Sequence, residues 1–342
     1  MQEQIIQLLT QARSSDSVKS AEEQLSSLSE SPEFLSALVS IYSSSEVEEI
    51  NRLSALLYAQ YVVNRYWENI STEMQNTIKS SIPVIISNWS TSNKSNKSMY
   101  HFVHLVISKT ITNNNIEWPE LPELIFQLLS EGSEDSCRAG LVLSNSLCGS
   151  IKEINVNNTM INEWAVNFGT TLMPILATLF SQCESYEFLS LGFHCASRIL
   201  RSRAEFNLLS FAESLIPIIE KSFLINNYEN QDEYLNFSNQ ALKFSIQYLT
   251  RYMNLESVVI PIEVLGQYLE VIQHLLPLEI PVKMKCDMLK VMCEIFKNPE
   301  TWVFIGENLI EFLTNLILPL YSLTPDDFSS LENNPEEFIC DL

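Results

Sequence analysis

A few side chains have the types and spacings that could perform chemistry. His101 and His104 lie three apart in MYHFVHLV, on one face of an expected helix, where they could share a metal ion. No Cys or carboxylate stands at ligand spacing beside them, so surface or half-buried histidines are the favoured interpretation. Cys286 and Cys293 lie seven apart, whereas zinc ligands typically follow C-x₂₋₄-C. Both cysteines are therefore expected to pack in the core.

Signals of catalysis are equally weak. His194 and Cys195 are adjacent, but neighbours in a helix point about 100° apart and do not form a nucleophile–base pair. The motifs G-x-x-x-x-G-K-[ST], G-x-G-x-x-G and G-x-S-x-G are all absent from the sequence. Paired acids such as Glu48–Glu49 are more simply solvated charge. We therefore predict a non-enzymatic protein with no catalytic residues, no cofactor and no metal site.

Composition limits the class of protein. The 342 residues include only 7 glycines, far below the usual share of about 7% that tight turns and phosphate loops consume, so helices are expected. The net charge of −22 disfavours nucleic acid and anionic membranes and favours basic partners. The seven dispersed cysteines are interpreted as reduced core thiols of a cytosolic or nuclear protein. No secretory signal is visible, and no window reaches the ~18 apolar residues of a membrane span.

Helical periodicity recurs along the whole chain. It predicts helices near 2–12, 17–30, 32–44, 47–67, 72–88, 97–112, 119–131, 134–150, 159–182, 186–202, 206–225, 232–253, 258–276, 280–297 and 300–323. Antiparallel pairs of these helices recur at close to the ~40–47 residues of HEAT repeats. The fold class is therefore predicted to be all-α, an α-solenoid of about eight repeats, with no internal domain boundary.

Apolar stripes and breaks refine this prediction. One stripe is expected at Leu235, Leu242, Ile246 and Leu249, and another at Met284, Met288, Val291, Ile295 and Phe296. STSNKSNK at 91–98 contains no apolar residue and is predicted to be a loop. Tryptophan rings at helix ends are expected to close gaps between the layers: Trp67, Trp89, Trp118 and Trp302.

Several segments resemble one family. AEEQL at 21–25, PEFLSALV at 32–39 and the spacing from Arg52 to Trp67 are similar to the first repeats of the importin-β (karyopherin) superfamily. NIEWPELPELIFQLL at 115–129 resembles the WPEL segment of that family. LTQA, PEFLSALVSIY and NRYW look closest to the importin-eleven group. LPLYSLTPDDFSSLENNPEEFICDL at 318–342 resembles an insertion found in importin-7/8, the importin-α exporter and importin-eleven proteins, whereas 160–315 matches only in helical pattern.

The resemblance implies a fold and a set of contacts. The fold would be a right-handed superhelix of HEAT repeats. The inner helices of its first repeats would bind Ran-GTP. Carried over, helix 47–67 would contribute Arg52, Gln60 and Asn64, on roughly one face. Acidic contacts would come from Asp326, Asp327, Glu332, Glu336 and Glu337. The domains would be importin-β N-terminal repeats at 1–112, further repeats at 113–323, and an acidic insertion or loop at 324–342 where the chain stops.

Two departures from the family pattern matter. Ala59, Gln60 and Tyr61 stand where the family has Leu-Lys-Asn, so one cationic contact is missing and Ran binding is expected to be weaker. The chain also stops where family members continue, so we expect a fragment or truncated product with an incomplete last repeat. For Arg52, an inter-repeat ladder or a salt bridge with Glu48 or Glu49 is an alternative to a Ran contact.

Two functions are therefore open. The first is a nuclear import receptor that shuttles between cytoplasm and nucleus, carries cargo through the pore and releases it to Ran-GTP. Its partners would be Ran-GTP, nucleoporins and protein cargo, for which the resemblance suggests ubiquitin-conjugating enzymes or ribosomal factors, with no nucleic acid and no membrane span. The alternative is a HEAT-repeat interaction scaffold that descends from a karyopherin and no longer uses Ran.

Overall fold

The computed structural model is helical throughout the part of the chain that it describes. These residues are 1–13, 18–28, 31–88, 93–112, 115–152, 154, 157–204, 206, 212–224, 232–252, 261–278, 280–304 and 314. The strand-like structure in these ranges is one isolated antiparallel bridge between Ile111 and Ile116. The chain divides into two compact units, residues 1–221 and 222–342. The predicted division after residue 112 lies inside the first unit and stays a prediction.

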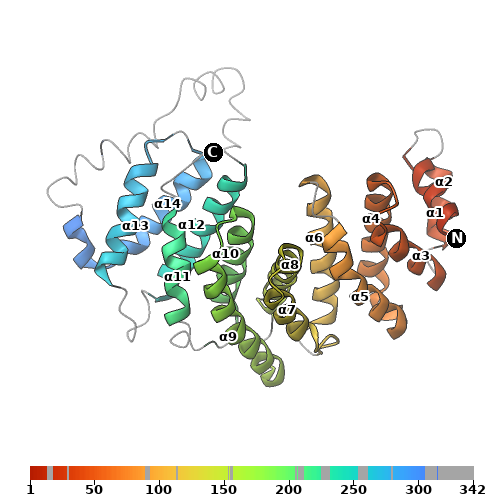
Figure 1. Ribbon diagram of the computed structural model, residues 1–342, viewed down its shortest axis with the longest axis horizontal. Helices are drawn as coiled ribbons and strands as arrows, with labels where there is room; N and C mark the ends of the chain where they lie inside the picture. The colour runs from red at the N-terminus through yellow and green to blue at the C-terminus, as the bar shows by residue number, and fades with distance from the viewer. Residues whose placement is uncertain are drawn as a thin grey trace, which may run out of the picture. The chain divides into compact units, whose positions relative to one another are not determined.

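The first unit is a series of helices joined by short connections (Figure 1). Their bounds are α1 Gln2–Gln11, α2 Val18–Leu28, α3 Pro32–Ser43, α4 Glu49–Tyr66, α5 Thr72–Asn88, α6 Asn93–Thr110, α7 Leu121–Ser130, α8 Glu134–Ile151, α9 Thr159–Gln182, α10 Tyr186–Leu200 and α11 Ala212–Ser222. A 3₁₀ turn, η1 Trp67–Asn69, follows α4.

These helices form two layers. The first layer contains α1, α3, α5, α7 and α9, and the second contains α2, α4, α6, α8 and α10. Helix α3 packs on α1 and α5, while α4 packs on α6, α6 on α8 and α8 on α10. Helices also pair across the layers, as α3 does with α4 and α7 with α8. Because the main contacts join helices no more than three positions apart in the series, the arrangement is the predicted α-solenoid.

Local sequence explains where the longest of these helices begin. The Ser133 hydroxyl caps α8 by accepting a hydrogen bond from the Ser136 amide at 3.1 Å. Asn158 caps α9 in the same way, accepting from the Ile161 amide at 3.3 Å. These side chains satisfy amides that have no partner within the first helical turn.

Helix α9 is apolar enough and long enough to cross a membrane by composition alone, although the sequence was expected to contain no such window. Within its most apolar window, 44% of the residues are buried inside the protein. The buried residues recur at helical spacing and include Ile161, Ala165, Phe168, Leu172 and Leu176. They pack toward α7 and α10, as the apolar stripe of a solenoid core helix does.

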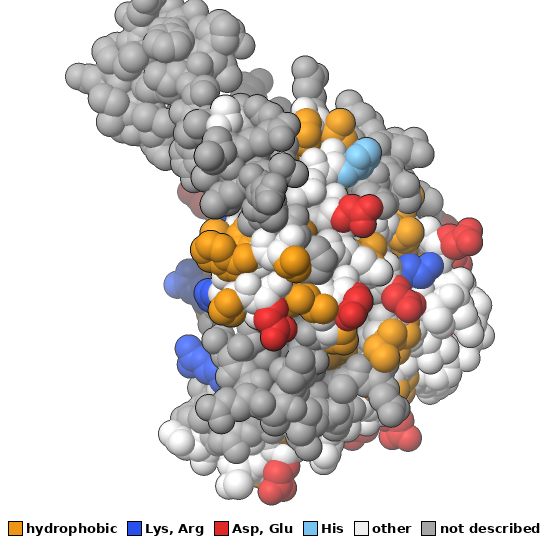
Figure 2. Space-filling view, turned by 90° about the vertical axis from the view of Figure 1, so that its left-hand side faces the viewer, with side chains coloured by type: hydrophobic (Ala, Val, Ile, Leu, Met, Phe, Trp, Pro, Cys, Tyr) orange, Lys and Arg blue, Asp and Glu red, His pale blue; other side chains and the backbone are white. Residues whose placement is uncertain are grey.

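The second unit contains α12 Asp232–Tyr252, α13 Ile262–Leu275, α14 Val282–Ile295 and the 3₁₀ helix η4 Pro299–Phe304. Helix α14 packs on α12 and on α13, and η4 packs on α13. Both predicted stripes are present, although Leu235, Ile246 and Phe296 are half-buried rather than buried. On the face shown in Figure 2, acidic side chains are scattered among exposed apolar ones and basic side chains are few.

Some local expectations were wrong. The predicted loop 91–98 is helical from Asn93 onward, because α6 extends one turn further toward its N-terminus than its apolar stripe does. The predicted helix 206–225 does not include Phe206, residues 207–211 lie outside the described residues, and α11 covers Ala212–Ser222. Of the predicted helix 300–323, the described part is a 3₁₀ turn to Phe304 and the single residue 314, and the remainder lies outside the described residues.

The cysteines and tryptophans divide into two groups. Cys148 and Cys195 are buried, as expected of core thiols, and burial raises the pKa of Cys195. Cys286 and Cys293 are exposed, which contradicts the prediction, because they lie on the side of α14 opposite its buried methionines. Trp67 and Trp118 are buried as predicted, whereas Trp302 is exposed on the short η4 helix. Trp89 and Cys340 lie outside the described residues.

The close packing of α7 on α8 can be tested at Gly140. A Cβ atom there would lie 2.8 Å from the Leu129 side chain and 3.2 Å from the Leu129 backbone nitrogen. We expect Gly140→Val to reduce the free energy of unfolding by about 1–3 kcal/mol, because the backbone atom cannot turn away. Denaturant unfolding measures this change in the free energy of unfolding. Gln127→Val, at an exposed position of α7, is the control, and equal stability of the two variants would contradict this packing.

Candidate functional site

Helix α4 has apolar residues on two opposite faces. One face is buried in the solenoid and carries Ala55, Leu56, Ala59, Val62 and Val63. The other face exposes 53% of Ile50, 47% of Leu57 and 45% of Tyr61, which recur at a spacing of seven and then four. One apolar stripe is enough to hold a helix in place. The second stripe is therefore available to contact another molecule.

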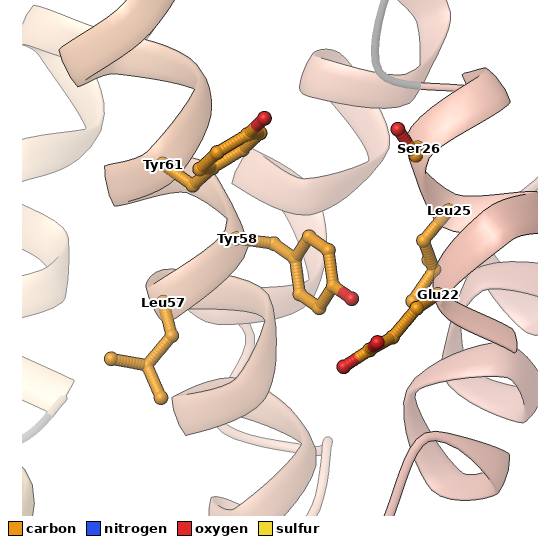
Figure 3. A pocket seen from close by; sticks show the side chains of 6 residues that line it. All are labelled: Glu22, Leu25, Ser26, Leu57, Tyr58 and Tyr61. Atoms are coloured by element: carbon orange, nitrogen blue, oxygen red, sulfur yellow. The ribbon is translucent and has the colours of Figure 1, made fainter. Parts of the chain in front are cut away.

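A groove runs along this second face, between α4 and α2. It has a volume of about 430 Å³ and is lined by Glu22, Leu25, Ser26, Leu57, Tyr58 and Tyr61. Figure 3 shows the Tyr58 ring reaching from α4 toward Glu22 on α2, with Tyr61 one turn further along α4. Both helices belong to the second layer, so the groove lies on that layer of the first unit.

Charge surrounds the apolar centre of the groove. Burial, with a smaller contribution from the negative Glu22, raises the pKa of Tyr58. Beyond Tyr61, the Arg65 guanidinium donates a hydrogen bond to the Tyr61 hydroxyl at 2.8 Å. The same guanidinium carbon lies 5.5 Å from the centre of the Tyr66 ring, within cation–π range. The surface thus presents an acid at one side, aromatic rings in the middle and a guanidinium at the end of α4.

The structure separates the three residues predicted on α4. Gln60 is half-buried and its Nε2 donates to the Ser98 carbonyl of α6 at 2.7 Å. Asn64 is exposed, and its carbonyl accepts a hydrogen bond from Lys109 Nζ at 3.1 Å. Arg52 is half-buried with its Nε enclosed, three residues before the buried Ala55. Because residues advance by 100° each, Gln60 and Asn64 share a face that Arg52 does not, so the expectation of one common face was wrong for Arg52.

The five acidic residues predicted to contact Ran are Asp326, Asp327, Glu332, Glu336 and Glu337, and all lie outside the described residues. Their role stays a prediction. The exposed stripe on α4 was missed by the sequence analysis. Its signal was present, since Ile50, Leu57 and Tyr61 add an apolar stripe to a helix whose other face already had one.

Two segments that carried the family resemblance contact each other. The buried Trp67, which ends the NRYW motif, donates from its indole nitrogen to Glu117 Oε2 at 3.3 Å. Glu117 directly precedes WPEL, and its carbonyl accepts from Lys79 Nζ at 2.9 Å. Burial lowers the pKa of Lys79. These bonds join α4, α5 and the connection before α7 into one local structure.

Polar side chains also tie the second-layer helices α6, α8 and α10 together. Arg138 on α8 makes two hydrogen bonds with the Glu187 carboxylate on α10, at 2.9 and 3.1 Å. His104 Nδ1 lies 3.3 Å from the Ser146 carbonyl, and Asn145 Nδ2 lies 3.1 Å from His194 Nδ1. His104 and His194 are therefore held in structural contacts between repeats.

The structure also shows how the residues of two sequence pairs lie: His101 with His104, and His194 with Cys195. His101 is exposed while His104 is half-buried, so the two do not converge on one point. Cys195 is buried with its Sγ 3.7 Å from the Leu141 carbonyl, away from the contact that His194 makes. Across the described ranges, no group of three or more His, Cys, Asp or Glu side chains could hold a metal ion.

Comparison with known proteins agrees with this architecture. Residues 21–88 match the model of the importin-beta N-terminal domain, a range that contains most of α2, all of α4 and the residues that line the groove between them. A search of curated protein sequences found no significant match. A structure of the exportin Cse1 in its cargo-free, cytoplasmic state is similar with a TM-score of 0.76 at 15% identity, over 99% of this chain and 39% of that one.

A second similar structure is the Kap95:Nup1 complex. Its TM-score is 0.52 at 14% identity, over 92% of this chain and 44% of that one. The chain therefore spans about two fifths of the length of these structures. Identities this low show a shared fold alone. Residues 21–88 are similar to the importin-beta N-terminal domain, and the chain as a whole shares the helical-repeat fold of the two structures.

The ion pair between α8 and α10 is testable. Arg138→Ala would leave the Glu187 carboxylate without its bidentate partner and remove the guanidinium that lies 5.4 Å from the Phe188 ring. We expect a loss of about 1–2 kcal/mol in the free energy of unfolding, between the values for exposed and buried pairs. Lys297→Ala, which removes an exposed pair with Glu294, is the control and should change stability little. Equal losses in the free energy of unfolding would show that the Arg138–Glu187 pair stabilises the protein no more than the control pair does.

Proposed function

We propose that this chain functions as a nuclear transport receptor of the importin type, which binds protein cargo and Ran-GTP and moves between cytoplasm and nucleus. The observation that carries the proposal is the importin-beta N-terminal domain match, because it covers the helices that expose the apolar groove. In this mechanism the protein does no covalent chemistry. Cargo and Ran-GTP bind to one solenoid with a coupling free energy, and Ran-GTP thereby releases the cargo.

The second-layer surface of α2 and α4 supplies the features that this function needs. Tyr61 and Leu57 offer apolar contact area, Asn64 offers an exposed amide, and Arg65 offers a positive charge. The net charge of −22 favours a basic partner over long range, although salt screens the attraction. We propose that Ran contacts Asn64 and the groove directly, and that Gln60, which already holds Ser98, contributes through the position of α6.

The remaining partners follow from the family. Kap95 was solved with Nup1, and the Cse1 structure is that of an exportin, so nucleoporins and a transported protein are the proposed partners here. Ubiquitin-conjugating enzymes or ribosomal factors remain the proposed cargo, on the resemblance of the sequence to the importin-eleven group. The acidic residues between Asp326 and Glu337 are proposed to contact the basic side of Ran.

A second candidate function is a protein-interaction scaffold that does not use Ran. The observation that favours it is the Gln60–Tyr61 pair, which replaces a cationic contact of the family. Gln60 Nε2 is already bonded within the protein, and Tyr61 is held by Arg65. In a scaffold, the groove would bind a partner without regard to the nucleotide on Ran.

A binding experiment separates the two functions. We expect the chain to retain Ran loaded with GTP and to retain Ran-GDP much less. Leu57→Asp should weaken Ran-GTP binding about tenfold or more, because a charge would replace an exposed apolar side chain that lines the groove. Calorimetry or surface plasmon resonance with both nucleotide states gives the measurement.

Val84→Asp is the matched control, because Val84 is similarly exposed but lies on the first-layer helix α5 of the same domain. It should leave Ran-GTP affinity within about twofold of the unmodified chain, as most positions outside an interface do. Identical binding of Ran-GTP and Ran-GDP would defeat the receptor proposal and favour the scaffold. An equal loss of Ran-GTP affinity in both variants would show that the groove is not part of the Ran interface.

A further inference from the structure

Helix α14 exposes a stripe of alternating lysine and cysteine. Lys283, Cys286, Lys290, Cys293 and Lys297 recur at spacings of three, four, three and four, and all five are exposed. At 100° per residue the four positions within the helix fall on one face, and Lys297 lies in the turn that follows Ile295, the last residue of α14. The buried face is opposite and carries Met284, Met288, Val291 and Ile295. We name these five exposed residues the lysine stripe.

The stripe is an exception in a strongly acidic chain. Only 20 of 342 residues are Lys or Arg, yet three of them fall in this one stripe. Lys290 Nζ bonds Asp287 and Lys297 Nζ bonds Glu294, each at 2.7 Å. Asp287 is 8% exposed and lies beneath the surface, whereas the Lys290 side chain is 63% exposed. Since an ammonium group has three donors, each bonded lysine still presents hydrogens to solvent.

One segment of the chain has the complementary charge. Residues 326–341 contain six acids and no basic residue, with Phe328, Leu331 and Phe338 between them. Twenty-one residues lie between Phe304, at the end of η4, and Asp326, and an extended chain of that length can span about 70 Å. Helix α14 has 14 residues and is about 21 Å long, so reach does not limit the contact. Because the acidic segment and the stripe belong to one chain, the docking is intramolecular and its effective concentration does not depend on the protein concentration.

We propose that the acidic segment 326–341 docks on the lysine stripe of α14 within the same chain. The acids pair with the three ammonium groups of the stripe. A separate acidic protein would have to compete with a ligand that is always present at high local concentration. The docking does not depend on the proposed function, but it has a consequence for it. A basic partner that binds the acidic segment must first displace it from α14.

The cysteines provide a direct test. Cys286 and Cys293 lie in the stripe, and Cys340 lies in the acidic segment. In the reduced full-length chain, a short bis-maleimide reagent should join Cys340 to Cys286 or Cys293, and peptide mass spectrometry would identify the link. The yield should fall about fivefold at 0.5 M salt, because exposed ion pairs are individually weak and screened. A yield that is insensitive to salt would overturn charge-driven docking.

Charge reversal sharpens the test. The triple variant Lys283→Glu, Lys290→Glu, Lys297→Glu should lower the yield about fivefold or more. The control Lys19→Glu, Lys97→Glu, Lys152→Glu changes the same charge at exposed lysines of the first unit and should leave the yield unchanged. Adding Asp326→Lys, Asp327→Lys and Glu332→Lys to the stripe variant should restore the yield. Equal loss in stripe and control variants, or no rescue, would overturn the proposal.

The remaining alternative to exclude is that the acidic segment of one chain docks on the lysine stripe of a second copy. Cross-linking a mixture of isotopically light and heavy chains at low concentration distinguishes the two cases. Links within light or within heavy chains support the proposal. Links between light and heavy chains at the statistical ratio would overturn it in favour of docking between two molecules.

Discussion

Burial of apolar helix faces between successive helical pairs is the interaction on which the rest of this structure depends. No pair can hide its stripe alone, so each must cover its neighbours. Helix α8 shows the constraint most clearly, because every residue from Ala139 to Ile151 except Asn145 is buried, between α6, α7 and α10. The layers follow from that requirement, and the surfaces that remain exposed are those on which partners can bind.

Polar contacts set how adjacent repeats lie against each other once the stripes are buried. Gln60 to Ser98, Lys109 to Asn64 and Arg138 to Glu187 each join neighbouring helices of the second layer. A buried apolar stripe tolerates small rotations, whereas a hydrogen bond with defined geometry does not. These bonds therefore specify orientation more than they add to the free energy of folding. They also occupy groups, such as Gln60, that sequence reasoning assigned to a partner.

The proposed function depends on surfaces rather than on a catalytic centre. The groove between α2 and α4 and the stripe on α14 differ in kind, since one is apolar with aromatic rings and the other is basic. They belong to different compact units of the chain. A receptor that must bind and release more than one protein needs such separate surfaces, because coupling between ligands requires distinct contacts for each.

The sequence by itself determined the helices and their order. The observed α3, α5, α9 and α12 agree with the predicted ranges to within one residue at each end, because apolar periodicity, caps and helix breakers are local properties. The family resemblance in the first repeats was also readable from the chain, and residues 21–88 match the family model.

Tertiary structure decided which side of each helix is covered. Cys286 and Cys293 were assigned to the core by residue type, but α14 buries its methionines instead, and the cysteines lie outside. Arg52 was grouped with Asn64 by spacing, whereas packing encloses its Nε. On a helix with apolar residues on two opposite faces, such as α4, periodicity cannot choose the inward face. That choice depends on the shape and position of the neighbouring repeats, which are separated from it by tens of residues.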